Sequence, residues 1–232
     1  MDTRETGQGV AAVAALLADP TRAVFCLALL DGRAWTAGEL ARHAGVAAST
    51  ATGHLNLLVT AGLLAEHRQG RHRYVGLAGP KAAELVESLA ALAPGDREPH
   101  RSLNAARRSR TLARGRTCYD HLAGMLGVAV TDALTERGFL DDRHGLALTS
   151  RGRDWLTGLG ITLAPTRRPA VRTCLDFTER RPHLAGAVGA ALCRHAFDTG
   201  WITRVGTTRA VALTEQGHDE LRRHLGLDLT AA

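Results

Sequence analysis

The chain has 232 residues, of which 45% are hydrophobic and only 4% aromatic, and it carries a formal net charge of +6 at pH 7. This length and apolar content are enough for two modest globular domains, which excludes a disordered chain, and no apolar run approaches the ~18 residues that a membrane-spanning helix needs. The opening residues MDTRET are charged and polar, unlike a signal peptide, so we expect a cytoplasmic protein with no membrane partner, and the positive charge suits a polyanion.

Two apolar helices are predicted at the start of the chain. Residues 9–18 are rich in Ala, Val and Leu, and they end before an Asp-Pro pair. Asp19 can cap a second helix and Pro20 suits its first turn. The body of this second helix is almost wholly apolar, so it should lie in a core, with Cys26 as a small buried residue.

Residues 36–74 predict a helix, a tight turn, a second helix and a basic hairpin in succession. Thr36 is a suitable N-cap, with Glu39 three residues later. Gly45 ends this first helix in a turn that needs a positive φ. The second helix restarts at Val46.

The second helix of this stretch has one apolar and one polar face. Leu55, Leu58 and Ala61 fall on one side at helical spacing, so that side should pack against the domain. The other side is free to contact a partner. Its N-terminal half carries the short polar residues Ser49, Thr50, Thr52, His54 and Asn56.

A basic hairpin follows. Gly62 ends the second helix, and residues 66–74 predict a hairpin that turns at Gly70. Its arginines can lie along a phosphate backbone. We therefore predict that DNA is contacted by Thr36, Ser49, Thr50, Thr52, His54, Asn56, Arg68, Arg71 and Arg73. A protein-docking module or a solvated loop are the alternatives, and the order of the elements favours DNA.

Several short motifs of this stretch resemble those of the ArsR/SmtB family of bacterial transcriptional repressors, over approximately residues 10–92. They are DPTR at 19–22, ELA at 39–41, TATGHLNLL at 50–58, AGLL at 61–64 and QGR at 69–71. The resemblance implies a winged helix-turn-helix whose second helix enters the major groove of a palindromic operator. It also implies a homodimer, and release of the DNA by an inducer.

Two features depart from the family pattern. Gly53 stands where the family commonly has a basic residue, which removes a DNA contact and weakens the helix by about 1 kcal/mol relative to alanine. The positions of the family's metal ligands carry Ala41 and His43 on one helix and Glu84 and Glu87 on another, so metal sensing at those positions is not implied.

After the hairpin, Pro80 is expected to open a helix that runs to Leu92, and the resemblance implies that this helix and the first one pair across the dimer axis. Residues 93–100 have the composition of a linker, and residues 101–116 hold six arginines and no acid. That basic segment is either a second phosphate contact or a solvated helix paired with acids elsewhere. We expect a DNA-binding domain at 1–93, a linker and basic helix at 94–116, and a C-terminal sensing or dimerisation domain at 117–232.

The C-terminal part repeats itself. RTCYD at 116–120 returns as RTCLD at 172–176, HLAG at 121–124 returns at 183–186, and LALTSRG at 146–152 returns as VALTEQG at 211–217. We predict two winged-helix-like units, each ending in a helix capped by Thr149 or Thr214. Their Gly124/Gly127 and Gly186/Gly189 pairs would allow close helix packing or leave room for a ligand. Neither unit has a basic hairpin tip, so neither should read DNA.

The four cysteines, Cys26, Cys118, Cys174 and Cys193, form no Cys-x-x-Cys pair, which argues against a zinc ribbon and a disulfide scaffold. If the repeats pack about a pseudo-twofold axis, an effector or thiol site is expected from Cys118, His121, Cys174 and His183. It would accept a soft metal, form a disulfide or bind a small organic molecule. The alternative is ordinary core packing, because six extra residues before His183 break the Cys-to-His spacing. No resident metal ligand is assigned and no cofactor is expected.

The sequence thus predicts a mainly α protein with small β-hairpin wings, in which an N-terminal winged helix-turn-helix is followed by two repeated winged-helix-like units. Its expected function is that of a cytoplasmic, homodimeric transcriptional repressor. The expected partners are a double-stranded DNA operator and a small-molecule effector. The alternative is a protein-interaction or ligand-binding module without specific DNA readout. Nucleophile-elbow, phosphate-loop and zinc-protease motifs are absent, so we do not expect an enzyme.

Overall fold

The computed structural model describes residues 2–93, 103–143, 145–163, 165 and 167–229. The chain divides into two compact units, an N-terminal unit at Met1–Ala90 and a C-terminal unit at Ala91–Ala232. The predicted linker residues 94–102 lie outside the described residues. The rest of the segment from 103 to 116 is a helix and the start of a strand in the C-terminal unit.

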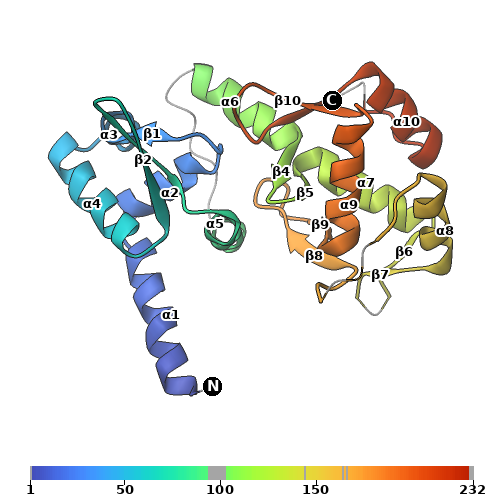
Figure 1. Cartoon of the computed structure of the whole chain (residues 1–232), viewed down its shortest axis with the longest axis horizontal. Helices are drawn as coiled ribbons and strands as arrows, with labels where there is room; N and C mark the ends of the chain where they lie inside the picture. The colour runs from blue at the N-terminus through green and yellow to red at the C-terminus, as the bar shows by residue number, and fades with distance from the viewer. Residues whose placement is uncertain (1, 94–102, 144, 164, 166, 230–232) are drawn as a thin grey trace. The chain divides into compact units, whose positions relative to one another are not determined.

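The N-terminal unit is a winged helix-turn-helix (Figure 1). Its elements are α1 (Thr3–Leu17), α2 (Pro20–Leu29), β1 (Trp35–Thr36), α3 (Ala37–Ala44), α4 (Ala48–Thr60), β2 (Leu64–Gln69), β3 (His72–Leu77) and α5 (Pro80–Leu92). The strands form one antiparallel sheet in the order β1-β3-β2. The hairpin β2–β3, which we call the wing, was predicted from the sequence, whereas the two-residue strand β1 was not.

The local signals that place these helices are confirmed. Asp19 caps α2 by accepting a hydrogen bond of 2.9 Å from the backbone N–H of Arg22. Thr36 and Glu39 form a reciprocal capping box at the start of α3. Gly45 ends α3 at a φ of 71°, which is favourable for glycine because it lacks a Cβ.

The core of the N-terminal unit lies where α2, α3, α4 and β3 meet. Phe25, Leu40, Leu55, Leu58 and Val75 are almost fully buried there. Cys26 is buried among them, as expected, and this burial raises the pKa of its thiol to about 11. The side of α4 that carries Leu55 and Leu58 is thereby fixed inward, and the opposite side faces solvent.

Helix α1 is longer than the helix expected at residues 9–18. It begins at Thr3 rather than at residue 9, and it contains no buried residue. In Figure 1 its N-terminal part extends away from the rest of its unit. Within one chain, its apolar side chains are therefore left partly or fully exposed to solvent.

In the C-terminal unit, α6 (Leu103–Arg114) is followed twice by the order hairpin, helix, hairpin, helix. The first copy comprises β4 (Arg116–Cys118), β5 (His121–Ala123), α7 (Gly124–Glu136), β6 (Leu140–Asp141), β7 (Ala147–Leu148) and α8 (Ser150–Gly158). The second comprises β8 (Arg172–Leu175), β9 (Pro182–Ala185), α9 (Gly186–Asp198), β10 (Ile202–Arg204), β11 (Val211–Leu213) and α10 (Glu215–Leu225).

The two copies share local detail. Thr149 caps α8 by accepting from the N–H of Gly152, and Thr214 caps α10 by accepting from the N–H of Gly217, both at 3.0 Å. These caps are the ones predicted from the repeated motif. Each capped glycine also lies against the backbone of its own copy, because a Cβ there would collide with Phe139 or Trp201.

The copies pack crosswise. Helix α7 of the first copy packs on β9 of the second, and α9 of the second packs on β5 of the first. The second glycine of each recurring pair, Gly127 or Gly189, does not create a helix–helix contact. A Cβ on Gly127 would lie 2.4 Å from the carbonyl oxygen of Leu122, and one on Gly189 would lie 2.5 Å from that of Leu184. These glycines let each helix lie directly against its preceding hairpin, and they leave no room for a ligand.

Among the described residues, no single helix is both long and apolar enough to cross a membrane. Only α1 and α2 taken together reach that length, and they are bent by 86° relative to each other.

Candidate nucleic-acid interface and buried cysteine-histidine cluster

The solvent side of α4 carries four of the nine predicted DNA-contacting residues. Ser49, Thr50, Thr52 and Asn56 are all exposed there. The residue before the helix, Ala47, has no side chain that can cap it, so the first backbone N–H groups of α4 point into solvent without a side-chain acceptor. Free N–H groups at a helix N-terminus are suited to a phosphate oxygen. The missing cap is a signal that our sequence analysis overlooked.

His54 and Thr36 are engaged within the protein. The Nδ1 atom of His54 lies 3.4 Å from the Arg22 guanidinium and 3.9 Å from the Asp19 carboxylate, so its half-buried ring sits between α4 and the start of α2. The Thr36 hydroxyl donates to the Glu39 carboxylate at 2.8 Å, within the capping box. Neither side chain is presented to a partner as openly as the exposed residues of α4.

A hydrogen-bonded network joins α4 to the wing. The Arg73 guanidinium donates to the side-chain oxygen of Asn56 at 2.8 Å and to the Glu66 carboxylate at 2.8 Å. Arg68 donates to the other oxygen of that carboxylate at 3.0 Å. The hydrogen bond from Arg68, with the charge of Arg73 nearby, lowers the pKa of Glu66. The network therefore holds the helix and the hairpin in a fixed relation.

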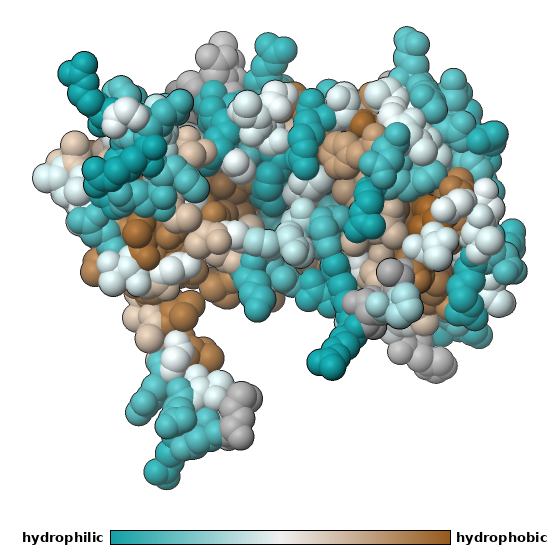
Figure 2. Space-filling view, viewed as in Figure 1, coloured by the Kyte–Doolittle hydropathy of each residue, from teal (hydrophilic) through white to brown (hydrophobic). Residues whose placement is uncertain are grey.

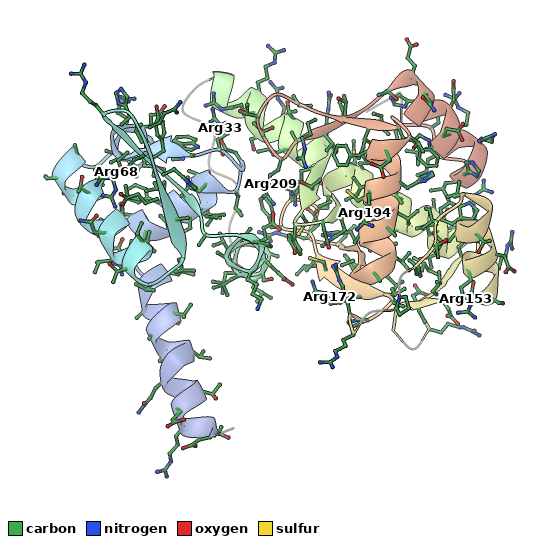
Figure 3. The ribbon with its side chains drawn as sticks, in the orientation of Figure 1. Arg33, Arg68, Arg153, Arg172, Arg194 and Arg209 are labelled. Atoms are coloured by element: carbon green, nitrogen blue, oxygen red, sulfur yellow. The ribbon has the colours of Figure 1, made fainter. Side chains whose placement is uncertain are left out.

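The tip of the wing is open and basic. The chain turns at Gly70 with a φ of 59°, next to the exposed Arg71. Arg71 has no hydrogen-bond or ion-pair partner among the residues that the structure describes. Arg68, which Figure 3 labels on the wing, is also largely exposed. The Arg71 guanidinium is available for a phosphate, and Arg68 bonds Glu66 through Nε alone, which leaves its two terminal nitrogens for a phosphate as well.

In the C-terminal unit the structure brings together the four residues of the predicted effector or thiol site, which we call the Cys–His cluster. Cys118 lies directly opposite His121 across the β4–β5 hairpin, and Cys174 lies directly opposite His183 across β8–β9. One side-chain donor atom from each of the four lies within 4.8 Å of the others. The two Sγ atoms are 3.8 Å apart, and the two imidazole centroids are 5.0 Å apart.

The six extra residues before His183 do not disturb this arrangement, contrary to our reasoning from spacing. In the first copy the chain turns between Cys118 and His121 through Tyr119 and Asp120 alone. In the second copy the additional residues lie in the longer loop between β8 and β9, so the register of the two strands still pairs Cys174 with His183.

Each copy also places an aspartate beside the cluster, held by an arginine. Asp120 accepts from Arg168 at 3.0 Å, and its Oδ1 lies 3.2 Å from the Nδ1 atom of His121. Asp176 is fully buried and accepts from the buried Arg116 at 2.9 Å. Burial alone would raise the pKa of Asp176, but Arg116 and neighbouring hydrogen-bond donors hold that pKa well below its usual range.

The position of Arg116 decides the role of one arginine of the basic segment at residues 101–116. This arginine is 1% exposed and stacks on the Phe177 ring at 4.2 Å, so it is a core residue and not a phosphate contact. The exposed arginines of α6, Arg107, Arg108, Arg110 and Arg114, remain on the surface.

Cys174 of the cluster differs from the buried Cys26 and Cys193 in the pKa of its thiol. The adjacent Cys118 thiol, with the imidazoles of His121 and His183, holds the pKa of the Cys174 thiol well below its usual range. Burial instead raises the pKa of the Cys193 thiol to about 12. A lowered pKa favours the thiolate form, which is the form that binds metals, and of these thiols only that of Cys174 is shifted in that direction.

Comparison with known proteins agrees with the N-terminal geometry. Residues 17–67 match the helix-turn-helix domain family HTH_20. The uncharacterized HTH-type transcriptional regulator YdfF of Bacillus subtilis is 39% identical over 224 residues, which cover 95% of this chain and 98% of that protein.

Two further relatives match shorter stretches. The HTH-type transcriptional regulator CmtR of Mycobacterium tuberculosis is 38% identical over 73 residues, which are 32% of this chain and 61% of CmtR. The transcriptional repressor SdpR of Bacillus subtilis is 38% identical over 61 residues, which are 26% of this chain and 67% of SdpR.

Proposed function

Because this chain belongs to the ArsR/SmtB-type helix-turn-helix transcriptional regulators, we propose that it is a repressor which binds a palindromic operator as a homodimer, with α4 in the major groove and the wing along the backbone. The observation that carries this proposal is the connected surface formed by the exposed polar side of α4 and the wing. The hydrogen bonds of Arg73 to Asn56 and Glu66 hold the two parts together before DNA arrives.

The residues of this surface have different roles. Thr50, Thr52 and Asn56 can reach base edges, since Asn56 still has its amide N–H groups to donate after its oxygen accepts from Arg73. Ser49 and the uncapped start of α4 suit a flanking phosphate. Arg68 and Arg71 contact the backbone. We assign Thr36 and His54 mainly to positioning α3 and α4.

The exposed apolar surface of α1 and α5 supports the homodimer. Val10 and Val13 of α1 are 65% and 39% exposed, and Leu89 and Leu92 of α5 are also exposed. Figure 2 shows apolar surface (brown) along the part of α1 nearest the rest of its unit. Burying exposed apolar surface against another chain is favourable, and a second copy of this protein presents the same apolar surface of α1 and α5.

We assign the C-terminal unit to sensing or dimerisation. Its two copies have the element order of a winged helix without a helix-turn-helix, and we regard them as winged-helix-like units. The β6–β7 hairpin has a tip of mixed charge, and the arginines of the β10–β11 hairpin, Arg204 and Arg209, contact Phe197 and the Thr117 carbonyl within the unit, so we do not assign either hairpin to DNA. We propose the functional boundaries 1–93, 94–116 and 117–232 on this basis, and we expect the protein to act in the cytoplasm, where bacterial operators are found.

The alternative of a module without DNA readout rests on Gly53. A side chain at Gly53 would meet nothing within 4 Å, so the glycine opens a gap in the surface of α4 without altering its fold. The remaining polar and basic residues of the surface are intact. We therefore favour DNA binding.

The test is selection of bound duplexes from a random pool with the purified full-length protein, followed by affinity measurements over a range of salt concentrations. We expect enrichment of an inverted repeat and a steep loss of affinity with salt. Failure to enrich any sequence above the starting pool, with no salt dependence, would leave the protein-interaction module as the better explanation.

A further inference from the structure

We propose that the Cys–His cluster binds one metal ion of the Zn²⁺ class, coordinated tetrahedrally by Cys118, His121, Cys174 and His183. The site lies within the C-terminal unit, whereas the helix-turn-helix belongs to the N-terminal unit. Each of the two repeats supplies one cysteine and one histidine as a cross-strand pair, so the ion would join the β4–β5 and β8–β9 hairpins.

The positions of the donor atoms fit a tetrahedral ion. With metal–sulfur bonds of about 2.3 Å, two sulfur ligands of a tetrahedral Zn²⁺ site lie about 3.8 Å apart. The Sγ atoms of Cys118 and Cys174 are 3.8 Å apart. Donor atoms of all four residues lie within 4.8 Å of one another, so small rotations of the side chains bring them onto one ion.

The histidines provide an independent observation, because three of their four ring nitrogens are buried without a hydrogen-bond partner among the described residues. His121 is 2% exposed and His183 is 1% exposed. Within the described part of the chain, the Nε2 atom of His121 and both ring nitrogens of His183 have no hydrogen-bond partner. A buried polar atom left unpaired costs about 1–3 kcal/mol, so two such imidazoles facing two thiols are hard to explain as core packing. A metal ion would accept a lone pair from each ring.

The surroundings of the cluster are those of a metal centre. A metal-bound histidine usually donates its second ring N–H to a carboxylate, which fixes the orientation of the ring. Asp120 occupies this position for Nδ1 of His121 at 3.2 Å, and Arg168 holds Asp120 in turn. Asp176 lies 3.7 Å from Nδ1 of His183, and Arg116 holds it in the same way. Each repeat thus places an arginine-held carboxylate beside a ligand histidine, within hydrogen-bond distance in the first repeat and slightly beyond it in the second.

The donor set defines the class of ion. Two thiolates and two imidazoles favour Zn²⁺ and softer ions of the same geometry over Mg²⁺, Ca²⁺ or Mn²⁺, which prefer oxygen ligands. Binding of a divalent ion to the two cysteine sulfurs releases one proton from each thiol that starts protonated, and the two resulting thiolates balance the charge of the ion. Four protein ligands leave no open position for a substrate, so the ion acts on folding and conformation.

The experiment uses the full-length protein, purified with reductant, stripped with a chelator and titrated with Zn²⁺ against a chromophoric chelator, and separately with Co²⁺. We expect one Zn²⁺ per chain. We also expect Co²⁺ to give the intense visible absorption of a tetrahedral site together with a thiolate-to-metal charge-transfer band. DNA is absent from these measurements, so their outcome is independent of the proposed function.

The variants Cys118→Ser and His183→Gln should each weaken Zn²⁺ binding at least ~100-fold. The matched control is Cys193→Ser, which removes a buried cysteine of the same unit outside the cluster and should bind Zn²⁺ as the wild type does. Because a ligand variant can lose its fold, alkylation of the wild-type protein gives a second readout. Zn²⁺ should protect Cys174 from iodoacetamide, with the modified residue identified by mass spectrometry.

Three results would overturn the proposal. The first is a wild-type protein that takes up no Zn²⁺ and gives no tetrahedral Co²⁺ spectrum. The second is equal Zn²⁺ affinity in Cys118→Ser and Cys193→Ser. The third is alkylation of Cys174 by iodoacetamide at the same rate with and without Zn²⁺.

Discussion

At the scale of single residues, the wing separates arginines that hold the structure from an arginine that is free to bind. Arg73 is committed to Asn56 and Glu66, so replacing it would alter the relation of α4 to the wing as well as any DNA contact. Arg71 at the tip has no such role within the described part of the chain. It is therefore the cleaner probe of a backbone contact.

We expect Arg71→Ala to weaken binding to specific and random DNA alike, and to reduce the slope of log affinity against log salt by about one, because one phosphate contact is lost. Fluorescence anisotropy at several salt concentrations measures both quantities. Arg153→Ala is the matched control, since Arg153 is an exposed arginine of the C-terminal unit (Figure 3) and should leave the slope unchanged. Equal slopes for all three proteins would remove the wing from the interface.

Thr52 probes base readout. The change Thr52→Val keeps the shape of the side chain and removes the hydroxyl, which in the free protein donates to the carbonyl of Ala48 at 2.9 Å. We expect it to cost about 1–3 kcal/mol on the selected operator and little on random DNA. Thr60→Val, at the exposed far end of α4, is the control. A similar loss on both DNAs would assign Thr52 to the backbone instead.

Asp176 probes the buried pair at the junction of the repeats. We expect Asp176→Asn to destabilise the C-terminal unit by about 3–5 kcal/mol at pH 7, because it leaves the charge of Arg116 buried without its partner. Since the folded state lowers the pKa of Asp176, the carboxylate stabilises the wild type fully above the unfolded pKa of about 4, and this contribution is lost as the pH falls toward the folded pKa.

The difference in the free energy of unfolding between wild type and Asp176→Asn should therefore be largest at neutral pH and become smaller in acid. Urea denaturation at a series of pH values measures this difference. A difference that stays constant down to acid pH would mean that the charge of Asp176 does not stabilise the fold.

At the scale of elements, two glycines within helices differ in the space available for a side chain. A Cβ at Gly53 of α4 meets nothing within 4 Å, whereas a Cβ at Gly127 of α7 would lie 2.4 Å from a backbone oxygen of β5. At Gly53, an added side chain changes stability only through helix propensity. At Gly127, the gain in helix propensity is opposed by a collision with the backbone of the hairpin, which cannot rotate away as a side chain can.

We therefore expect Gly53→Ala to stabilise the N-terminal unit by about 0.5–1 kcal/mol, and Gly127→Ala to destabilise the C-terminal unit despite the same gain in helix propensity. Thermal and urea denaturation monitored by circular dichroism compare the two variants. Destabilisation by Gly53→Ala would show that α4 is less exposed in solution than the structure describes.

At the scale of the whole molecule, α1 is the helix that we expect to hold two chains together as the dimer that binds DNA. It has no buried residue, so its apolar side contributes little to the stability of a single chain. We expect the double change Val10→Asp and Val13→Asp to dissociate the dimer and weaken operator binding without unfolding the N-terminal unit. Analytical ultracentrifugation and circular dichroism test this together. A wild-type monomer, or a variant that remains dimeric, would contradict the assignment.

Features that depend on neighbours along the chain were predictable from the sequence. The capping box at Thr36, the turn at Gly45, the wing around Gly70 and the caps at Thr149 and Thr214 each depend on hydrogen bonds or backbone angles within a few residues. Such interactions leave a local pattern in the sequence. The helix-turn-helix followed from these patterns, and the residues that we propose to contact DNA were chosen from them.

Other features required the tertiary structure because they join residues far apart in the chain. Arg116 and Asp176 are 60 positions apart, and Cys118 and Cys174 are 56 apart, so no local pattern reports their contact. The spacing before His183 even pointed away from the cluster, because the sequence does not reveal that a hairpin loop absorbs the extra residues while strand pairing preserves the register. The sequence by itself determined which residues could bind DNA or a metal. Only the crosswise packing of the two repeats decided that four of them share one buried site, because that packing depends on burying apolar surface from both copies at once.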